Sequence, residues 1–90
     1  MESVLQRDEE RCFLCGRYGI TEEHHCIHGI ANRKNAEKYG LKVNICPLCH
    51  RNLHDKGVND LYLIKYAQEY FEANIGDRNE FRRVFGKSWL

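Results

Sequence analysis

The chain has 90 residues and a formal net charge of +1, so it can form one small domain and lacks the charge of a strongly basic nucleic-acid binder. No apolar run approaches the roughly 20 residues of a membrane span, and no apolar signal segment precedes the first cysteine. We therefore expect a cytoplasmic protein without a membrane partner. In that setting its 5 cysteines serve metal or redox chemistry rather than disulfides.

The front half is expected to be irregular. Residues 1–11 form a polar lead, either disordered or a frayed helix, and residues 12–19 resemble a zinc knuckle with two glycines that permit a tight turn. A short strand is expected around His24 to Ile27. Residues 32–39 favour a short helix or turn that ends at Gly40.

The second half predicts one more strand and a series of helices. Residues 41–45 alternate between apolar and polar side chains, which indicates a strand. Pro47 suits the first turn of a helix that runs to about Lys56, and Asp77 opens a last helix as part of a capping box. A longer helix lies between them, with an apolar stripe at spacings of three and four residues: Leu61, Ile64, Ala67, Phe71 and Ile75.

Two Cys-x-x-Cys pairs predict a structural zinc site. Each pair spans one tight turn, so both of its sulfurs can bind the same ion, and four thiolates complete a tetrahedral zinc. The predicted ligands are Cys12, Cys15, Cys46 and Cys49. A thioredoxin-like redox motif is the alternative, but it needs a βαβ context and only one pair. Cys26 is left over and is interpreted as a small buried apolar side chain.

The histidines predict a second, open metal site. His50 and His54 are four residues apart, so a helix presents them on one face, whereas the neighbouring Cys49 points in another direction. His24 and His25 are adjacent on a strand and alternate in direction. One of them can therefore bind an ion while the other acts as a general base. The fifth histidine, His28, is interpreted as a surface residue, with a metal ligand or a phosphate contact as the alternatives.

Charge is distributed unevenly along the chain. Residues 1–30 carry a net charge of −3, residues 31–56 a net charge of +4, and residues 57–90 are neutral overall. The basic excess coincides with the rear histidines, where a polyanion would approach. The residues expected to contact phosphates are Arg33, Lys34, Lys38, Lys42 and Arg51.

The order Cys-x-x-Cys, double His, Cys-x-x-Cys-His and a further His four residues on resembles the HNH (His-Asn-His) endonucleases that have a zinc-ribbon frame. The stretch EEHHCIHGIANRKNAEKYGLKVNICPLCHRNLH is also similar to small nuclease-like proteins of phages and prophages. The resemblance covers residues 12–56 with specific motifs and residues 57–90 only loosely. It implies a single α+β domain: a ββα-metal core stapled by the four-cysteine zinc, followed by a C-terminal helical extension.

The resemblance also implies residue roles. His24 matches a metal ligand and His25 the general base that activates the attacking water. His50 matches the final motif histidine, a metal ligand, and His54 the additional ligand of the branch typified by colicin DNases. The family's central asparagine normally lies nine residues before the final motif histidine, and Leu41 occupies that position here. In the family this asparagine ties the loop between the two strands and so presents the base. Asn44 is the nearest candidate, serving from a shortened loop; otherwise another group has taken this role.

We therefore expect a metal-dependent endonuclease that hydrolyses DNA, with one catalytic divalent ion (Mg²⁺, Mn²⁺, Ni²⁺ or Zn²⁺) beside the structural zinc. One site per monomer nicks one strand, so a double-strand cut requires a homodimer or sequential nicking. Phage packaging or recombination proteins are candidate partners, in a bacterial host cell. The alternatives are an inactive zinc-containing nucleic-acid-binding module, favoured by the displaced asparagine, and a protein-interaction adaptor, favoured by the aromatic-rich tail.

Overall fold

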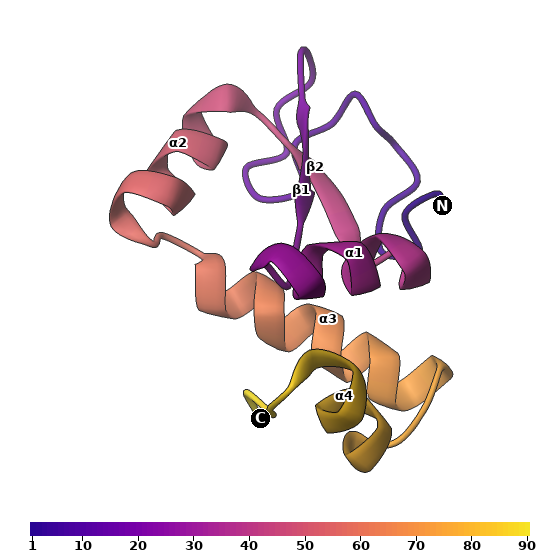
Figure 1. Cartoon of the computed structure of the whole chain (residues 1–90). Coiled ribbons are helices and arrows are strands. Elements are labelled where there is room, and N and C mark those ends of the chain that lie inside the picture. Colours follow the sequence, from indigo (N-terminus) through magenta and orange to yellow (C-terminus); the bar gives the residue numbers. More distant parts are fainter.

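A two-stranded antiparallel sheet and four helices form the α+β fold, which the computed structural model describes over all 90 residues (Figure 1). Helices α1 and α2 both contact strand β1, and α4 contacts both α1 and α3. No helix combines the length and the apolar character needed to cross a bilayer. The elements in order are β1 (Glu22–His25), α1 (Ile30–Tyr39), β2 (Lys42–Ile45), α2 (Pro47–Lys56), α3 (Asp60–Asn74) and α4 (Arg78–Phe85).

The sheet fixes the directions of the paired histidines. His24 lies opposite Val43 and His25 lies opposite Lys42, so the two imidazoles leave β1 on opposite faces, as expected for adjacent strand residues. β1 begins and ends two residues earlier than predicted. The reason is that Cys26 and Ile27 leave the ladder and enter the core, where both are fully buried.

The N-terminal lead is ordered along the free edge of β2, in contrast to the expected frayed or disordered segment. The backbone N–H of Val4 donates to Gly40 O at 2.9 Å, and Asn44 N–H donates to Gln6 Oε1 at 2.7 Å. Phe13 N–H then donates to Asn44 O at 2.9 Å. These bonds satisfy backbone groups that an edge strand would otherwise leave open for pairing with another chain.

Helix ends follow the local sequence closely. α2 spans the predicted residues and ends at Gly57, which adopts φ 70°. The Asp77 side chain accepts from Glu80 N–H at 2.8 Å, so the predicted N-terminal cap of α4 is confirmed. The segment predicted as a short helix or turn is a full helix, α1, which begins two residues earlier than expected.

The apolar stripe predicted for α3 is partly wrong. Leu61 and Ile75 are exposed, because they lie at the two ends of the helix, beyond the core that covers its middle. The buried face is instead made of Leu63, Ile64, Ala67, Gln68 and Phe71.

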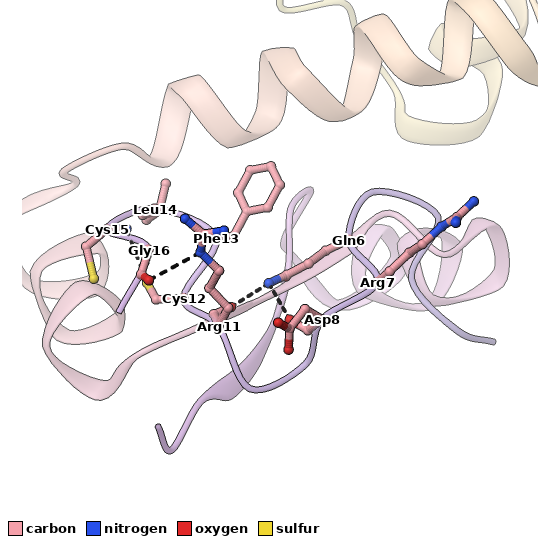
Figure 2. Close-up of a pocket in the computed structure, with 9 residues that line it drawn as sticks. All are labelled: Gln6, Arg7, Asp8, Arg11, Cys12, Phe13, Leu14, Cys15 and Gly16. Carbon is pink, nitrogen blue, oxygen red and sulfur yellow. Dashed lines mark hydrogen bonds between the residues drawn. The ribbon is translucent and has the colours of Figure 1, made fainter. Parts of the chain in front are cut away.

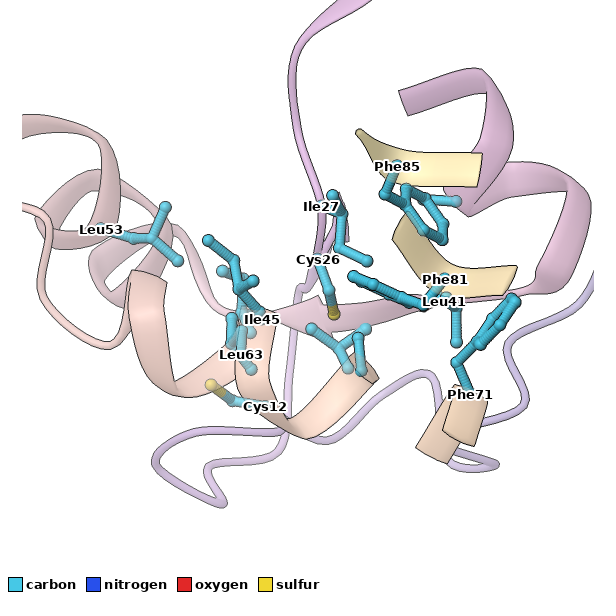
Figure 3. Packing of buried hydrophobic residues seen from close by; sticks show 14 of the residues in the cluster. Cys12, Cys26, Ile27, Leu41, Ile45, Leu53, Leu63, Phe71, Phe81 and Phe85 are labelled. Atoms are coloured by element: carbon cyan, nitrogen blue, oxygen red, sulfur yellow. The ribbon is translucent and has the colours of Figure 1, made fainter. Parts of the chain in front are cut away.

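One hydrophobic core joins the front and the rear of the chain (Figure 3). It contains Cys12 and Ile45 next to the zinc-knuckle segment and Phe71, Phe81 and Phe85 from the last two helices. The Phe71 and Phe81 rings meet edge to face with centroids 5.3 Å apart. Residues 57–90 therefore share their core with residues 12–56.

Candidate functional site

The four predicted zinc ligands come together. Their sulfur atoms all lie within 4.8 Å of one another, and Cys15 Sγ is 3.8 Å from Cys46 Sγ. Four sulfurs about 2.3 Å from a tetrahedral zinc would be about 3.8 Å apart. The cluster of Cys12, Cys15, Cys46 and Cys49 therefore has the donor set and spacing of a structural metal site that suits zinc.

Two tight backbone turns position these thiols. In the first, Gly16 N–H donates to Cys12 O at 2.9 Å and Cys12 N–H donates to Arg17 O at 2.8 Å. Gly16 has φ 79°, a conformation that favours glycine. Arg11 Nε–H donates to Gly16 O at 3.2 Å (Figure 2). In the second, Cys46 is the N-cap residue of α2, and Cys49 lies in the first turn of that helix.

Backbone donors make one of the four thiols acidic. Burial alone would raise the pKa of Cys12, but N–H groups of Cys15, Cys46 and Leu14 outweigh it and lower that pKa to about 6. A thiolate at this position is the form that binds a metal ion. Cys26 lies outside the cluster, is fully buried, and has a pKa raised to about 12 by that burial. It is therefore an inert core thiol, as the sequence suggested.

Three imidazoles form a second cluster. Strand β1 supplies His24, and one face of α2 supplies His50 and His54; their ligand nitrogens lie within 4.8 Å of one another. The His24 ring is 5.4 Å from the His50 ring and 5.8 Å from the His54 ring, centroid to centroid. The strand and the helix thus bring together the three histidines that the sequence proposed as ligands.

Ring nitrogens of the three histidines lie around a common space. His50 Nδ1–H donates to Glu22 Oε1 at 2.8 Å, which leaves a lone pair on His50 Nε2. His54 Nε2–H donates to that nitrogen at 2.9 Å, so one proton lies between the two rings. His24 Nε2 is buried and has no hydrogen-bond partner, which is costly unless something else satisfies it. Once the proton between His54 and His50 is released, these three nitrogens can hold a divalent cation, because neutral imidazoles are good ligands for such ions.

Burial keeps His24 neutral. Its pKa falls to about 4, first because only 4% of the residue is exposed and then because of repulsion from His50 and His54. A neutral ring is the metal-binding form of histidine. The environment of His24 therefore suits a ligand rather than a residue that exchanges protons near neutral pH.

A cavity of ≈ 450 Å³ opens onto this cluster and contains the remaining histidines. His25 lines it although its ring leaves the opposite face of β1, and its Nε2 lies 2.9 Å from Glu37 Oε1 on α1. His28 also lines the cavity and contacts Asp60 Oδ1 at 2.9 Å. The His28 side chain is 56% exposed, as expected of a surface residue, and its contact with Asp60 attaches it to the start of α3.

The five basic residues expected at phosphates differ in their placement. Arg33 lines the histidine cavity, and Lys34 lines an adjoining cavity with His25. Lys38 and Arg51 are exposed, on α1 and α2. Lys42 departs from the expectation: only 8% of it is exposed, and its ammonium group contacts carboxylates of Glu23 at 3.2 Å and Glu37 at 3.0 Å. It is therefore an internal counter-ion rather than a free cation.

Two residues outside the sequence predictions hold His25 and His28, and one predicted candidate lies apart from the site. Glu37 holds His25 and Asp60 holds His28. No spacing rule pairs either histidine with a carboxylate on a separate helix. Asn44 forms hydrogen bonds through its backbone: its N–H donates to Gln6 Oε1, and its carbonyl accepts from Phe13 N–H. Its side chain forms no hydrogen bond with His25.

No protein-family model matches the chain, and no significant match was found among curated proteins or solved structures. The geometry of the two clusters is therefore the basis for any functional conclusion.

Proposed function

We propose that the protein is a metal-dependent endonuclease of the HNH type that hydrolyses phosphodiester bonds of DNA. The observation that carries the proposal is the buried, unpartnered Nε2 of His24 facing the ring nitrogens of His50 and His54. A domain that needed metal only for folding would have the thiol site and no reason to build this second cluster. The adjacent cavity gives a phosphate room to approach.

The sequence resemblance and the order of elements support the same activity. β1 and β2 pair antiparallel and α2 follows β2 directly, which is the order expected of a ββα-metal core. The proposed ligands lie on β1 and α2, as the resemblance implies. The chain departs from that pattern in one respect, since α1 is inserted between the two strands.

The residues around the cavity divide the chemistry between them. When bound by the three imidazoles, a divalent ion supplies stabilisation of charge on the phosphate and on the leaving oxygen. His25 accepts the proton of the attacking water at Nδ1, because its Nε2 is turned toward Glu37. Arg33 lines the same cavity and binds the phosphate next to the scissile bond.

The test is nicking of supercoiled plasmid with Mg²⁺, Mn²⁺, Ni²⁺ or Zn²⁺ by wild type, His25→Ala and His54→Ala. Loss of a general base typically lowers the rate by about 10²- to 10⁴-fold, so His25→Ala should lose turnover at every metal concentration. His54→Ala removes a ligand, so its activity should recover partly as the metal concentration is raised. Zinc content and circular dichroism verify that both variants remain folded.

A second candidate, an inactive zinc-containing nucleic-acid-binding module, is favoured by one observation. Asn44, the nearest match to the family asparagine, contacts the N-terminal segment through its backbone and does not position His25. This reading predicts that wild type binds plasmid but leaves it uncut with all four ions. That result would rule out the nuclease.

A further inference from the structure

The imidazole of His25 is held by a helix that lies between the two strands. Its Nε2 is 2.9 Å from Glu37 Oε1, and Glu37 lies in the second half of α1, which spans Ile30–Tyr39. Only 11% of the His25 side chain is exposed. This contact joins β1 to the inserted helix, on the face of the sheet opposite to His24.

Glu37 is held as an anion. Hydrogen bonds from the Met1 amino group, from His25 and from the Lys42 ammonium lower its pKa to about 2. At neutral pH the carboxylate can therefore only accept hydrogen bonds. A neutral imidazole that faces it must donate Nε2–H, which leaves the lone pair on Nδ1.

The neighbouring charges do not provide an equivalent contact. Glu23 is the other carboxylate beside this ring, but its nearest oxygen is 3.9 Å from His25 Nε2, beyond hydrogen-bonding distance. Lys42 bridges Glu23 and Glu37 at 3.2 and 3.0 Å. Its ammonium group pairs with both carboxylates, so the three residues form an ion-pair network beside His25.

We propose that Glu37 is the positioning residue of the proposed nuclease. It fixes the orientation and tautomer of His25 and so presents the base, which the asparagine does in the resembled family. The inference rests on the proposed function for its catalytic consequence. Its structural content, a carboxylate that accepts Nε2–H, stands independently. The proposed role of Glu37 accounts for both the inserted helix and the displaced asparagine, because α1 supplies the contact to His25 that Asn44 does not make.

The test compares wild type, Glu37→Gln and Glu37→Asp in the plasmid assay and by nitrogen-15 NMR of the histidine rings. An amide at position 37 can accept or donate, so it no longer selects one tautomer. We expect Glu37→Gln to lower kcat on the order of 10- to 100-fold, with little change in KM or in metal dependence. Glu37→Asp keeps the charge and should restore part of kcat. The NMR spectrum should change from the Nε2–H tautomer to a mixture in Glu37→Gln.

Two variants serve as references. Glu80→Gln removes a carboxylate that pairs with Arg83 on α4, away from the cavity, and should keep wild-type kcat. Glu23→Gln removes the neighbouring charge without the hydrogen bond, so a loss equal to that of Glu37→Gln would overturn the proposal. Nicking lost in His25→Ala but kept in Glu37→Gln would overturn this inference alone. If wild type never nicks, the proposed function fails, and the tautomer still decides: an Nδ1–H form in wild type overturns the contact.

Discussion

His24 is a buried histidine, and its effect on stability has a definite sign. In the unfolded chain a histidine titrates near pH 6.5, whereas burial and the neighbouring imidazoles lower the pKa of folded His24 to about 4. Between these values the unfolded state binds more protons. The free energy of unfolding therefore falls as the pH decreases through this window and is unaffected by His24 above it.

This difference can be measured by denaturant unfolding at about pH 7 and about pH 5.5, with one equivalent of zinc for the thiols. From pH 7 to pH 5.5, we expect the free energy of unfolding to fall by about 1 kcal/mol more in wild type than in His24→Gln. Comparing the two proteins cancels the protonation of the cysteines, which is common to both. Equal losses in the two proteins would mean that His24 is as accessible to protons when folded as when unfolded.

The residues of the two clusters could be predicted from the sequence, but the contacts that hold His25 and His28 could not. Spacing placed His50 and His54 on one helical face, and strand alternation separated His24 from His25. The partners Glu37 and Asp60 lie 12 and 32 positions from the imidazoles they hold. Such contacts depend on how helices pack against the sheet, which local periodicity does not encode.

At the scale of the elements, two helix-ending glycines with the same backbone conformation have different surroundings. Gly40 ends α1 with φ 71° and Gly57 ends α2 with φ 70°. A Cβ at position 40 would lie 2.5 Å from Glu2 O and 3.3 Å from Val4 N, whereas a Cβ at position 57 meets nothing within 4 Å. Gly40 therefore permits both the left-handed turn and the close approach of the N-terminal segment.

The pair makes a matched test of that approach. Gly57→Ala should lower the free energy of unfolding by about 1 kcal/mol, since it only places an alanine in the left-handed conformation. Gly40→Ala should cost about 3 kcal/mol, because backbone must also shift away from the new methyl group. Denaturant unfolding with zinc present measures both values. Equal costs would indicate that the N-terminal segment does not pack against Gly40.

Elements with local signals were predicted well, and those set by tertiary packing were not. Pro47 and Gly57 define α2, and Asp77 caps α4, because each of these residues acts within one turn of itself. The buried face of α3 and the ordered N-terminal lead depend on distant partners. Val4, for example, is held by the carbonyl of Gly40, and nothing in the polar sequence around it signals that bond.

At the scale of the whole molecule, α2 connects the two clusters. Cys46 and Cys49 at its start contribute to the thiol site, while His50 and His54 on another face contribute to the imidazole site. Cys12 belongs both to the thiol site and to the core. A metal bound by the thiols therefore fixes the knuckle to α2, and it sets the position of the imidazoles at the same time.

Cys46→Ser should therefore abolish folding and, with it, the proposed nicking, because metal binding supplies much of the folding free energy of small zinc domains. Cys26→Ser is the matched control: it replaces a buried thiol outside the cluster and should cost about 1–3 kcal/mol for an unpaired hydroxyl while leaving the metal in place. Cobalt substitution separates the two sites, since only thiolate ligation gives a sulfur-to-metal charge-transfer band. We expect that band in wild type and in Cys26→Ser. Cys46→Ser should lose both the band and the native circular dichroism. A Cys46→Ser protein that stayed folded and retained one tightly bound zinc per chain would contradict this prediction. It would mean that the hydrophobic core, without the four-thiol site, is enough to position the imidazoles.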